Sequence, residues 1–111
     1  MKLQQKTLHE VCLDTGISRR TIQGYEKMGL VRPAGKNKYG HLLYGEAEQQ
    51  RIQLIWFYQQ LELSRKEIQE LLNAPSDRKK EILKKQVAKL ESKHLIQLKL
   101  IKKAKEHIST L

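Results

Sequence analysis

The sequence predicts a mainly α-helical protein in which a winged helix-turn-helix domain, residues 1–75, precedes a long coiled-coil dimerisation helix, residues 76–111. Three observations lead to this fold class. Two short helical segments are joined by a glycine turn at Gly16, which is typical of a helix-turn-helix. A glycine-bounded, lysine-rich segment at 35–45 indicates a small β-hairpin. Apolar residues then recur every seven positions from Leu83 onward, which indicates a coiled coil.

The charge of the chain favours a polyanionic partner such as nucleic acid. The 111 residues include 22 Lys+Arg and 12 Asp+Glu, for a net charge of +10. The excess is uneven, because residues 1–75 carry +3 and residues 76–111 carry +7. Simple solubility is the alternative explanation, and charge alone does not exclude it.

Cys12 is the only cysteine, so an intrachain disulfide is excluded and a reducing compartment is expected. The chain shows neither a signal-peptide pattern nor an apolar run approaching the ~20 residues that span a membrane, so we expect a cytoplasmic protein. Its four histidines lack zinc-site spacing, and no catalytic motif is present. We therefore expect no metal, no cofactor and no enzymatic activity.

The first two helices carry clear start signals. Thr7 and Glu10 form a capping box, which predicts a helix from about Leu8 to Asp14. Ser18 suits the N-cap of a second helix, from about Arg19 to Met28. The second helix of such a pair usually enters the major groove of DNA, so its polar residues are the candidate DNA contacts. These candidates are Ser18, Arg19, Arg20, Thr21, Gln23 and Tyr25. The helix dipole disfavours cations in a first turn, which indicates that the two arginines face an anion.

A third helix is expected from residue 46 to about 61. Its apolar stripe contains Ile52, Ile55 and Trp56, widened by Phe57 and Tyr58 among others. The aromatic cluster could line a ligand pocket, but we favour a role in the core that holds the DNA-binding domain rigid.

Two further helices follow. Ser64 and Glu67 form a second capping box, which starts a short helix that ends at Leu72. Ser76 is expected to cap a helix from Asp77 to near the C-terminus. Its seven-residue seam is too polar to be stable alone, so a partner is required. The seam residues are Leu83, Val87, Leu90, His94, Gln97, Ile101, Ala104 and Ile108.

Five blocks, in this order, resemble the MerR-type transcription regulators across nearly the whole chain. They are Leu8 to Val11, Thr15 to Ile22, Tyr25 to Pro33, Gly40 with Tyr44, and Leu63 to Ile68. The resemblance implies a homodimer held by an antiparallel pair of the long helices, which binds an inverted repeat in promoter DNA. RNA polymerase is a further candidate partner. His94 and Gln97 then lie near the centre of the dimer seam, where pairing would fix the register; a pH-sensing His94 is the less favoured alternative.

The resemblance also implies that the hairpin is a wing that contacts the DNA backbone. Lys36, Lys38 and His41 are then candidate contacts, and Tyr44 either packs at the base of the wing or bonds a phosphate. Ordinary turn charges are the alternative reading for the lysines. Since no sensor segment follows the long helix in this sequence, the chain resembles a short form without an effector domain, or else a piece of a longer regulator.

The sequence departs from the family pattern at Gln23, Gly24 and Leu42, where the family usually has an arginine, an aromatic residue and an arginine. Lost arginines remove charge-assisted phosphate contacts, although Gln23 can still pair with an adenine edge. These departures support two alternatives. One is a protein-interaction module with a degenerate DNA-reading surface, and the other is an excisionase-like protein that bends DNA.

Overall fold

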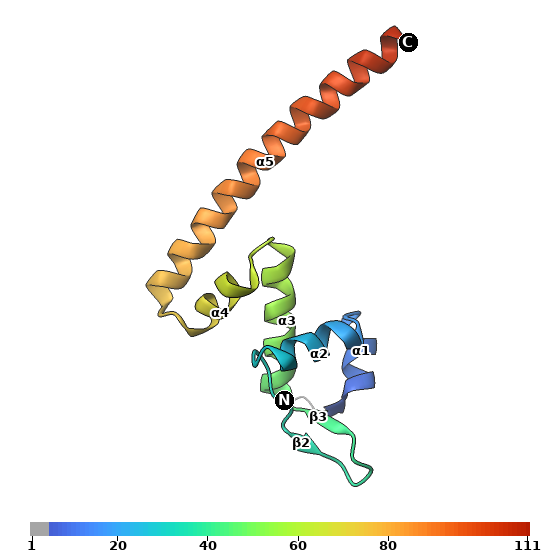
Figure 1. Ribbon diagram of the computed structural model, residues 1–111, viewed down its shortest axis with the longest axis vertical. Coiled ribbons are helices and arrows are strands. Elements are labelled where there is room, and N and C mark those ends of the chain that lie inside the picture. The colour runs from blue at the N-terminus through green and yellow to red at the C-terminus, as the bar shows by residue number, and fades with distance from the viewer. Residues whose placement is uncertain (1–4) are drawn as a thin grey trace. The chain divides into compact units, whose positions relative to one another are not determined.

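The computed structural model describes residues 5–111, which form five helices and three short strands (Figure 1). Helices dominate, as the sequence predicts. The chain divides into two compact units, one ending at Gln60 and the other beginning at Leu61. The predicted boundary after residue 75 falls inside the second unit. The elements are β1 (Lys6–Thr7), α1 (Leu8–Thr15), α2 (Arg19–Lys27), β2 (Gly35–Lys36), β3 (Leu42–Tyr44), α3 (Glu46–Gln60), α4 (Arg65–Asn73) and α5 (Ser76–Thr110).

Side-chain caps start α1 and α2, as predicted. The Thr7 hydroxyl accepts a hydrogen bond from the Glu10 amide at 3.3 Å, and the Glu10 carboxylate accepts one from the Thr7 amide at 3.0 Å. Gly16, with φ at +73°, then turns the chain between the two helices. The Ser18 hydroxyl accepts from the Thr21 amide at 3.2 Å, which satisfies one of the free donors of the first turn of α2.

A small antiparallel sheet lies beside these helices, with its strands in the order β1-β3-β2. The pairs Lys6↔Tyr44 and Gly35↔Leu43 set its register. The β2–β3 hairpin is the wing that the glycines predict. The strand β1 is an addition, because residues 1–6 look like a polar lead-in from sequence; residues 1–4 lie outside the described part of the chain.

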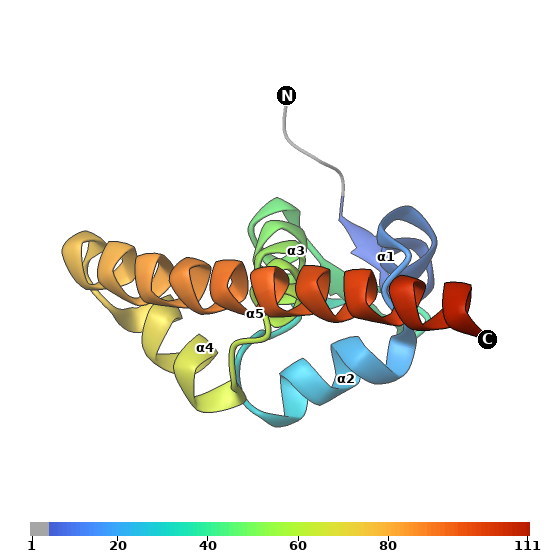
Figure 2. The ribbon, with the colours of Figure 1, turned by 90° about the horizontal axis from the view of Figure 1, so that it is seen from above.

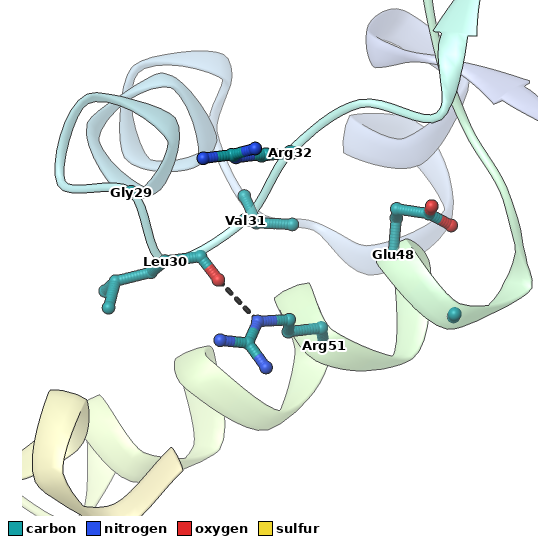
Figure 3. Close-up of a pocket in the computed structure, with 7 residues that line it drawn as sticks. Gly29, Leu30, Val31, Arg32, Glu48 and Arg51 are labelled. Carbon is teal, nitrogen blue, oxygen red and sulfur yellow. Dashed lines mark hydrogen bonds between the residues drawn. The ribbon is translucent and has the colours of Figure 1, made fainter. Parts of the chain in front are cut away.

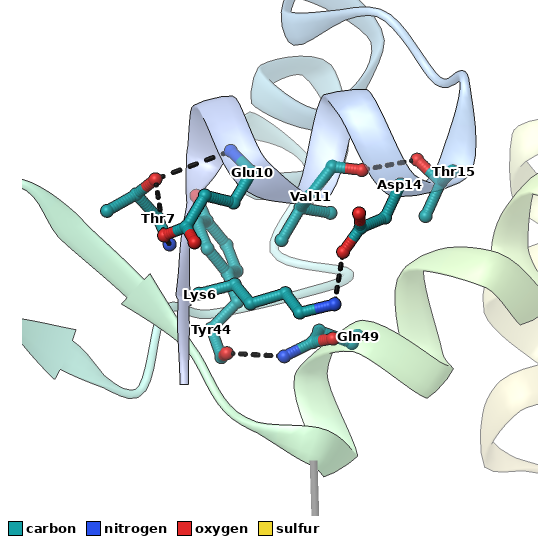
Figure 4. A network of polar contacts seen from close by, with 8 residues as sticks. All are labelled: Lys6, Thr7, Glu10, Val11, Asp14, Thr15, Tyr44 and Gln49. Carbon is teal, nitrogen blue, oxygen red and sulfur yellow. Dashed lines mark hydrogen bonds and ion pairs between the residues drawn. The ribbon is translucent and has the colours of Figure 1, made fainter. Parts of the chain in front are cut away.

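Polar contacts connect β1 to α1 and the wing to α3 (Figure 4). Lys6 forms an ion pair with Asp14 at the far end of α1. Gln49 of α3 donates from its amide nitrogen to the carbonyl of Tyr44 at 2.8 Å. Buried backbone acceptors are costly unless they are bonded, so Gln49 explains how the wing strand ends against α3.

The core of the first unit draws on all three helices and the wing. Helix α3 contributes Ile52, Ile55 and Tyr58, three residues apart along one face. Trp56 and Phe57, in contrast, are 38% and 53% exposed, so the prediction that they belong to the core is wrong. Each follows a buried position by one or two residues, which turns it away from the inward face of a helix with 3.6 residues per turn. The other buried residues of the core are Val11, Ile17, Ile22, Tyr25, Leu30, Val31 and Tyr44, and the polar Gln49 is buried as well.

The second unit joins α4 to the first turns of α5. Ser64 and Glu67 form the predicted capping box of α4, and Ile68 and Leu71 are buried. Gln86 of α5 is also buried, and it donates to the Leu61 carbonyl at 2.7 Å. Ser76 does not cap α5: Pro75 occupies the N-cap without a side-chain hydrogen bond.

Helix α5 is a single unbroken helix (Figure 2). Every residue of α5 from position 91 onward is exposed. Within residues 5–111, none of the helices is long and apolar enough to cross a membrane.

Candidate nucleic-acid interface

The start of α2 presents an exposed basic edge. Arg19, Arg20 and Gln23 are exposed. Their backbone is fixed by Ile22, which is fully buried three residues after Arg19. The geometry therefore offers two guanidinium groups and one amide to a ligand that approaches the N-terminus of α2. These are the groups that read guanine, adenine and phosphate in DNA.

Ser18 and Thr21 contribute to this edge mainly by shaping it. Their hydroxyl oxygens lie 2.8 Å apart, and the Ser18 hydroxyl also caps the helix. Ser18 is exposed and Thr21 is half-buried. Both hydroxyls already have a protein partner, so any contact to DNA from them would be shared with the cap.

Tyr25, a predicted DNA contact, lies in the core instead. It is 3% exposed, and its hydroxyl donates to Oε1 of Gln59 on α3 at 2.5 Å. Burial raises the pKa of Tyr25 from its usual 10.0 to about 12. Tyr25 follows the buried Ile22 by three residues, so the two share one face of α2. The same spacing, read from the sequence, would have placed it inward.

Tyr44 is also fully buried, which selects packing at the base of the wing over a phosphate bond. Its hydroxyl donates to the carboxylate of Glu26 on α2. Burial, followed by this bond to Glu26, raises the pKa of Tyr44 above its usual range. Tyr25 and Tyr44 therefore hold α2 between α3 and the wing, and neither reaches the outer surface.

The wing tip carries the predicted basic residues in exposed positions. Lys36, Lys38 and His41 are all exposed, and the Lys38 ammonium lies 5.1 Å from the centre of the Tyr39 ring. Asn37, which the sequence analysis missed, organises the turn: its Oδ1 accepts from the amides of residues 39 and 41 at 2.9 and 3.0 Å. An asparagine two residues before a backbone donor is a known turn signal, so the sequence did contain this information.

Leu42, at the start of β3, occupies the position where the related pattern has a wing arginine, and it is half-buried. Gly24, the other departure in α2, has open space around it: a Cβ atom there would meet no other atom within 4 Å. The structure therefore gives no steric reason for the glycine within the protein itself.

A second group of basic side chains, also missed from sequence, lines a cleft of about 350 Å³ after α2 (Figure 3). Arg51 of α3 donates from Nε to the carbonyl of Leu30, which holds the segment that leaves α2. Arg32 lies across the same cleft from Arg51, and Glu48 lines the cleft from α3, the helix that also carries Arg51. The bond from Arg51 to a backbone carbonyl explains this arginine structurally, by satisfying a buried acceptor.

The residues of the predicted dimer seam differ in their exposure along α5. Leu83 and Leu90 are half-buried, whereas Val87 and the members from position 94 onward are exposed. The sequence analysis missed Gln86, the one buried residue of this helix. The seam itself remains a prediction. The exposed members are Val87, His94, Gln97, Ile101, Ala104 and Ile108.

In the part of the chain that the structure describes, His, Cys, Asp and Glu form no group of three able to hold a metal ion. Cys12 is half-buried on α1, as a small residue beside the core.

Several solved structures of transcription regulators resemble this fold. The N-terminal part of MtaN, the Bacillus subtilis multidrug transporter activator, superposes with a TM-score of 0.73 at 26% identity, over 93% of this chain and 97% of that one. HiNmlR, described as a MerR family regulator lacking the sensor domain, bound to promoter DNA, gives a TM-score of 0.72. It covers 86% of this chain and 76% of its own, and at 20% identity it supports the fold alone.

Curated relatives agree in sequence. The HTH-type transcriptional activator mta of Bacillus subtilis (strain 168) is 34% identical over 98 residues, which are 82% of this chain but 37% of that protein. A probable heavy metal-dependent transcriptional regulator of Haemophilus influenzae is 31% identical over 83 residues, 75% of this chain and 63% of its own length. The chain thus spans less than two thirds of these relatives.

The family described as MerR HTH family regulatory proteins matches residues 6–75, a region that holds β1, both helices of the helix-turn-helix, the wing, α3 and α4. This match assigns the chain to a family of regulators and not of enzymes. The chain belongs to the MerR family of helix-turn-helix regulatory proteins.

Proposed function

We propose that this chain is a transcription regulator that binds promoter DNA as a homodimer, with α2 in the major groove and the wing on the phosphate backbone. The observation that carries the proposal is the exposed edge of α2. Arg19, Arg20 and Gln23 project from a helix whose opposite face is anchored by Ile22 and Tyr25. The promoter-bound relative HiNmlR supports it, since that protein has the same fold.

The division of labour follows from the chemistry of each group. Gln23 and one or both arginines are placed to read base edges, because an amide matches adenine and a guanidinium matches guanine. Lys36 and Lys38 on the wing are placed for phosphates, which position the protein without reading sequence. An inverted repeat as target follows from two-fold symmetry of the dimer. We place this activity in the cytoplasm, where promoter DNA is accessible.

The test is the double variant Arg19→Ala/Arg20→Ala in a DNA-binding titration. The DNA would be the region upstream of the protein's own gene. We expect affinity to fall by more than about tenfold, since each lost contact of this kind contributes about 1–3 kcal/mol. The matched control, Lys102→Ala/Lys103→Ala, removes the same two charges from the exposed part of α5.

Two results would contradict the proposal. One is an unchanged affinity in the arginine variant with its fold intact, and the other is an equal loss in both variants, which would indicate only a nonspecific charge effect. In the first case the protein-interaction alternative would gain support. Partner binding through α5 would then be the activity to measure.

A further inference from the structure

The turn that follows α3 is held by side chains of α5. The chain passes from the first unit to the second at this turn, between Gln60 and Leu61. Gln86 donates from its amide nitrogen to the carbonyl of Leu61 at 2.7 Å. The Lys93 ammonium pairs with the carboxylate of Glu62 at 2.8 Å. One helix thus bonds two consecutive residues of the turn, from 25 and 31 residues further along the chain.

Glu62 occupies the position at which the direction of the departing chain is decided. It lies two residues after the end of α3, and its φ is +63°. Helices commonly end with a left-handed residue at this position, usually glycine, because a side chain resists that conformation. A residue with a side chain persists there only when the surrounding structure supports it. Since position 62 is not a glycine, the turn depends on support from other elements, and α5 supplies it.

Gln86 is suited to forming this bond rather than to apolar packing. It is the one buried residue of α5, at 8% exposed, and it is polar. A buried amide is costly unless it is bonded, and the same holds for the carbonyl that it meets. Lys93 and Glu62 are both exposed, and an exposed ion pair contributes little by itself. The buried bond therefore supplies most of the support, and the ion pair adds to it.

These contacts lie beside the predicted dimer seam. Gln86, Leu90 and Lys93 follow one another at spacings of four and three residues, so they share one side of α5. Leu90 belongs to the seam and is half-buried. A partner helix on the seam would therefore lie next to the two side chains that hold the turn.

We propose that Gln86 and Lys93 are positioning residues, which restrict the motion of the joint between the two units by fixing the turn at Leu61 and Glu62. The consequence for DNA rests on the proposed function: a dimer with restricted joints accepts a narrow range of spacings between its half-sites. With looser joints, each α2 could still bind its half-site, but over a wider range of spacings. The reason is that simultaneous binding depends on whether the connection can span both sites.

The motion of the joint can be measured without DNA. Spin labels are attached at Gln53→Cys on α3 and Lys99→Cys on α5, both exposed positions, in a Cys12→Ala background. Diluting labelled chains into unlabelled ones gives the distribution of distances across the joint within one chain. Gln86→Leu/Lys93→Met removes both contacts and keeps side chains of similar size. We expect this double variant to widen the distribution by about twofold, because more conformations of the joint become populated.

The second measurement is DNA affinity as a function of half-site spacing. The probe is the region upstream of the protein's own gene, with the half-sites located by footprinting and the segment between them lengthened or shortened by one or two base pairs. Wild-type affinity should fall by about tenfold or more across this series, and affinity of the double variant by less than about threefold. Lys93→Arg should behave as the wild type, because it keeps the ion pair. Lys102→Met, a matched change at an exposed lysine of α5, should also behave as the wild type.

An unchanged distance distribution in the double variant would overturn the proposal, as would a widened one in Lys102→Met. An equal loss of affinity at every spacing would also overturn it, because that result indicates damage to the DNA-binding surface. If the double variant unfolds, Lys93→Met alone decides the outcome, since an exposed position tolerates such a change. A wild-type protein that binds no DNA would refute the proposed function, and the distance measurement would still decide whether α5 restricts the joint.

Discussion

At the scale of single residues, the tyrosines decide which face of α2 is free. The Tyr25 hydroxyl donates to Gln59 on α3, and the Tyr44 hydroxyl donates to Glu26 on α2. These two hydrogen bonds hold α2 against its neighbours. Tyr25, which the sequence predicts to contact DNA, instead helps to orient the exposed side chains of α2. The arginines at the start of α2 owe their fixed direction to these buried contacts.

The burial of Tyr25 leads to a prediction about alkaline stability. Its pKa is about 12 in the folded protein, above its usual 10.0, so folding favours the protonated phenol. This contribution to stability is complete below about pH 10 and is lost as the pH rises toward 12. Tyr25→Phe should flatten the decline in unfolding free energy between these values, when measured by urea titration at each pH.

The same variant should be less stable at neutral pH, by about 1 kcal/mol, because Oε1 of Gln59 loses its donor. Tyr39→Phe is the matched control: Tyr39 is exposed on the wing, so its removal should change neither quantity. If both variants keep the wild-type pH profile, then burial of Tyr25 does not contribute to alkaline unfolding.

At the scale of elements, Gly24 lowers the stability of α2. Glycine in a helix is destabilising by roughly 0.5–1 kcal/mol relative to alanine, and a Cβ at this position meets no atom within 4 Å. Gly24→Ala should therefore stabilise the free protein by about that amount in thermal or urea unfolding. A loss of stability would reveal a contact that the free space does not suggest.

The DNA affinity of the same variant tests why the glycine is present. Reduced affinity in a stabilised protein would mean that the DNA backbone approaches Gly24 closely. Unchanged affinity would leave the glycine without a role in binding.

The connection from α3 to α4 stores strain at Glu62. Its φ of +63° is the only positive value at a non-glycine residue in the described chain, and its carboxylate pairs with Lys93 at 2.8 Å. Both Glu62→Gly and Glu62→Ala remove this exposed ion pair, so their difference reports the backbone alone. The glycine variant should be more stable by about 1 kcal/mol, because alanine also resists the left-handed conformation. Equal stabilities in urea unfolding would show that the turn relaxes without strain.

The sequence predicts a structural feature well when the interaction behind it joins residues that are close together in the chain. The caps at Thr7, Ser18 and Ser64 were predictable, because each bond spans only three residues. Burial of Tyr25 follows from its spacing of three residues from Ile22 but was missed, whereas exposure of Trp56 depends on which face of α3 packs against the other elements. In the candidate interface, the basic residues at the start of α2 and at the wing tip could be identified as surface charges from the sequence. The cleft lined by Arg32 and Arg51 could be identified only from the fold.

At the scale of the whole molecule, the long exposed part of α5 is the surface that we propose for dimerisation. From position 91 onward every residue of this helix is exposed, yet it carries a row of large aliphatic side chains. An isolated apolar stripe of this kind is stable in water mainly when a second helix covers it. The proposed homodimer supplies that cover.

Two isoleucines of similar exposure allow a matched test of the seam. Ile101 lies on the seven-residue seam and is 51% exposed, whereas Ile96 lies off it and is 60% exposed. Ile101→Glu should shift the protein toward monomer in sedimentation experiments at micromolar concentration, because it buries a charge in the interface. Ile96→Glu should sediment as the wild type does. A wild-type monomer, or dissociation by the Ile96 change alone, would contradict the seam.

The charge on the long helix has a consequence for the conditions under which the molecule works. Each copy of residues 76–111 carries +7, so two copies brought side by side repel each other, and added salt relieves that repulsion. Added salt also releases a basic protein from its polyanion. Added salt therefore favours assembly of the dimer and disfavours its binding to DNA. The regulatory effect on transcription, whether repression or activation, should be greatest at intermediate salt rather than rise steadily as the buffer is diluted.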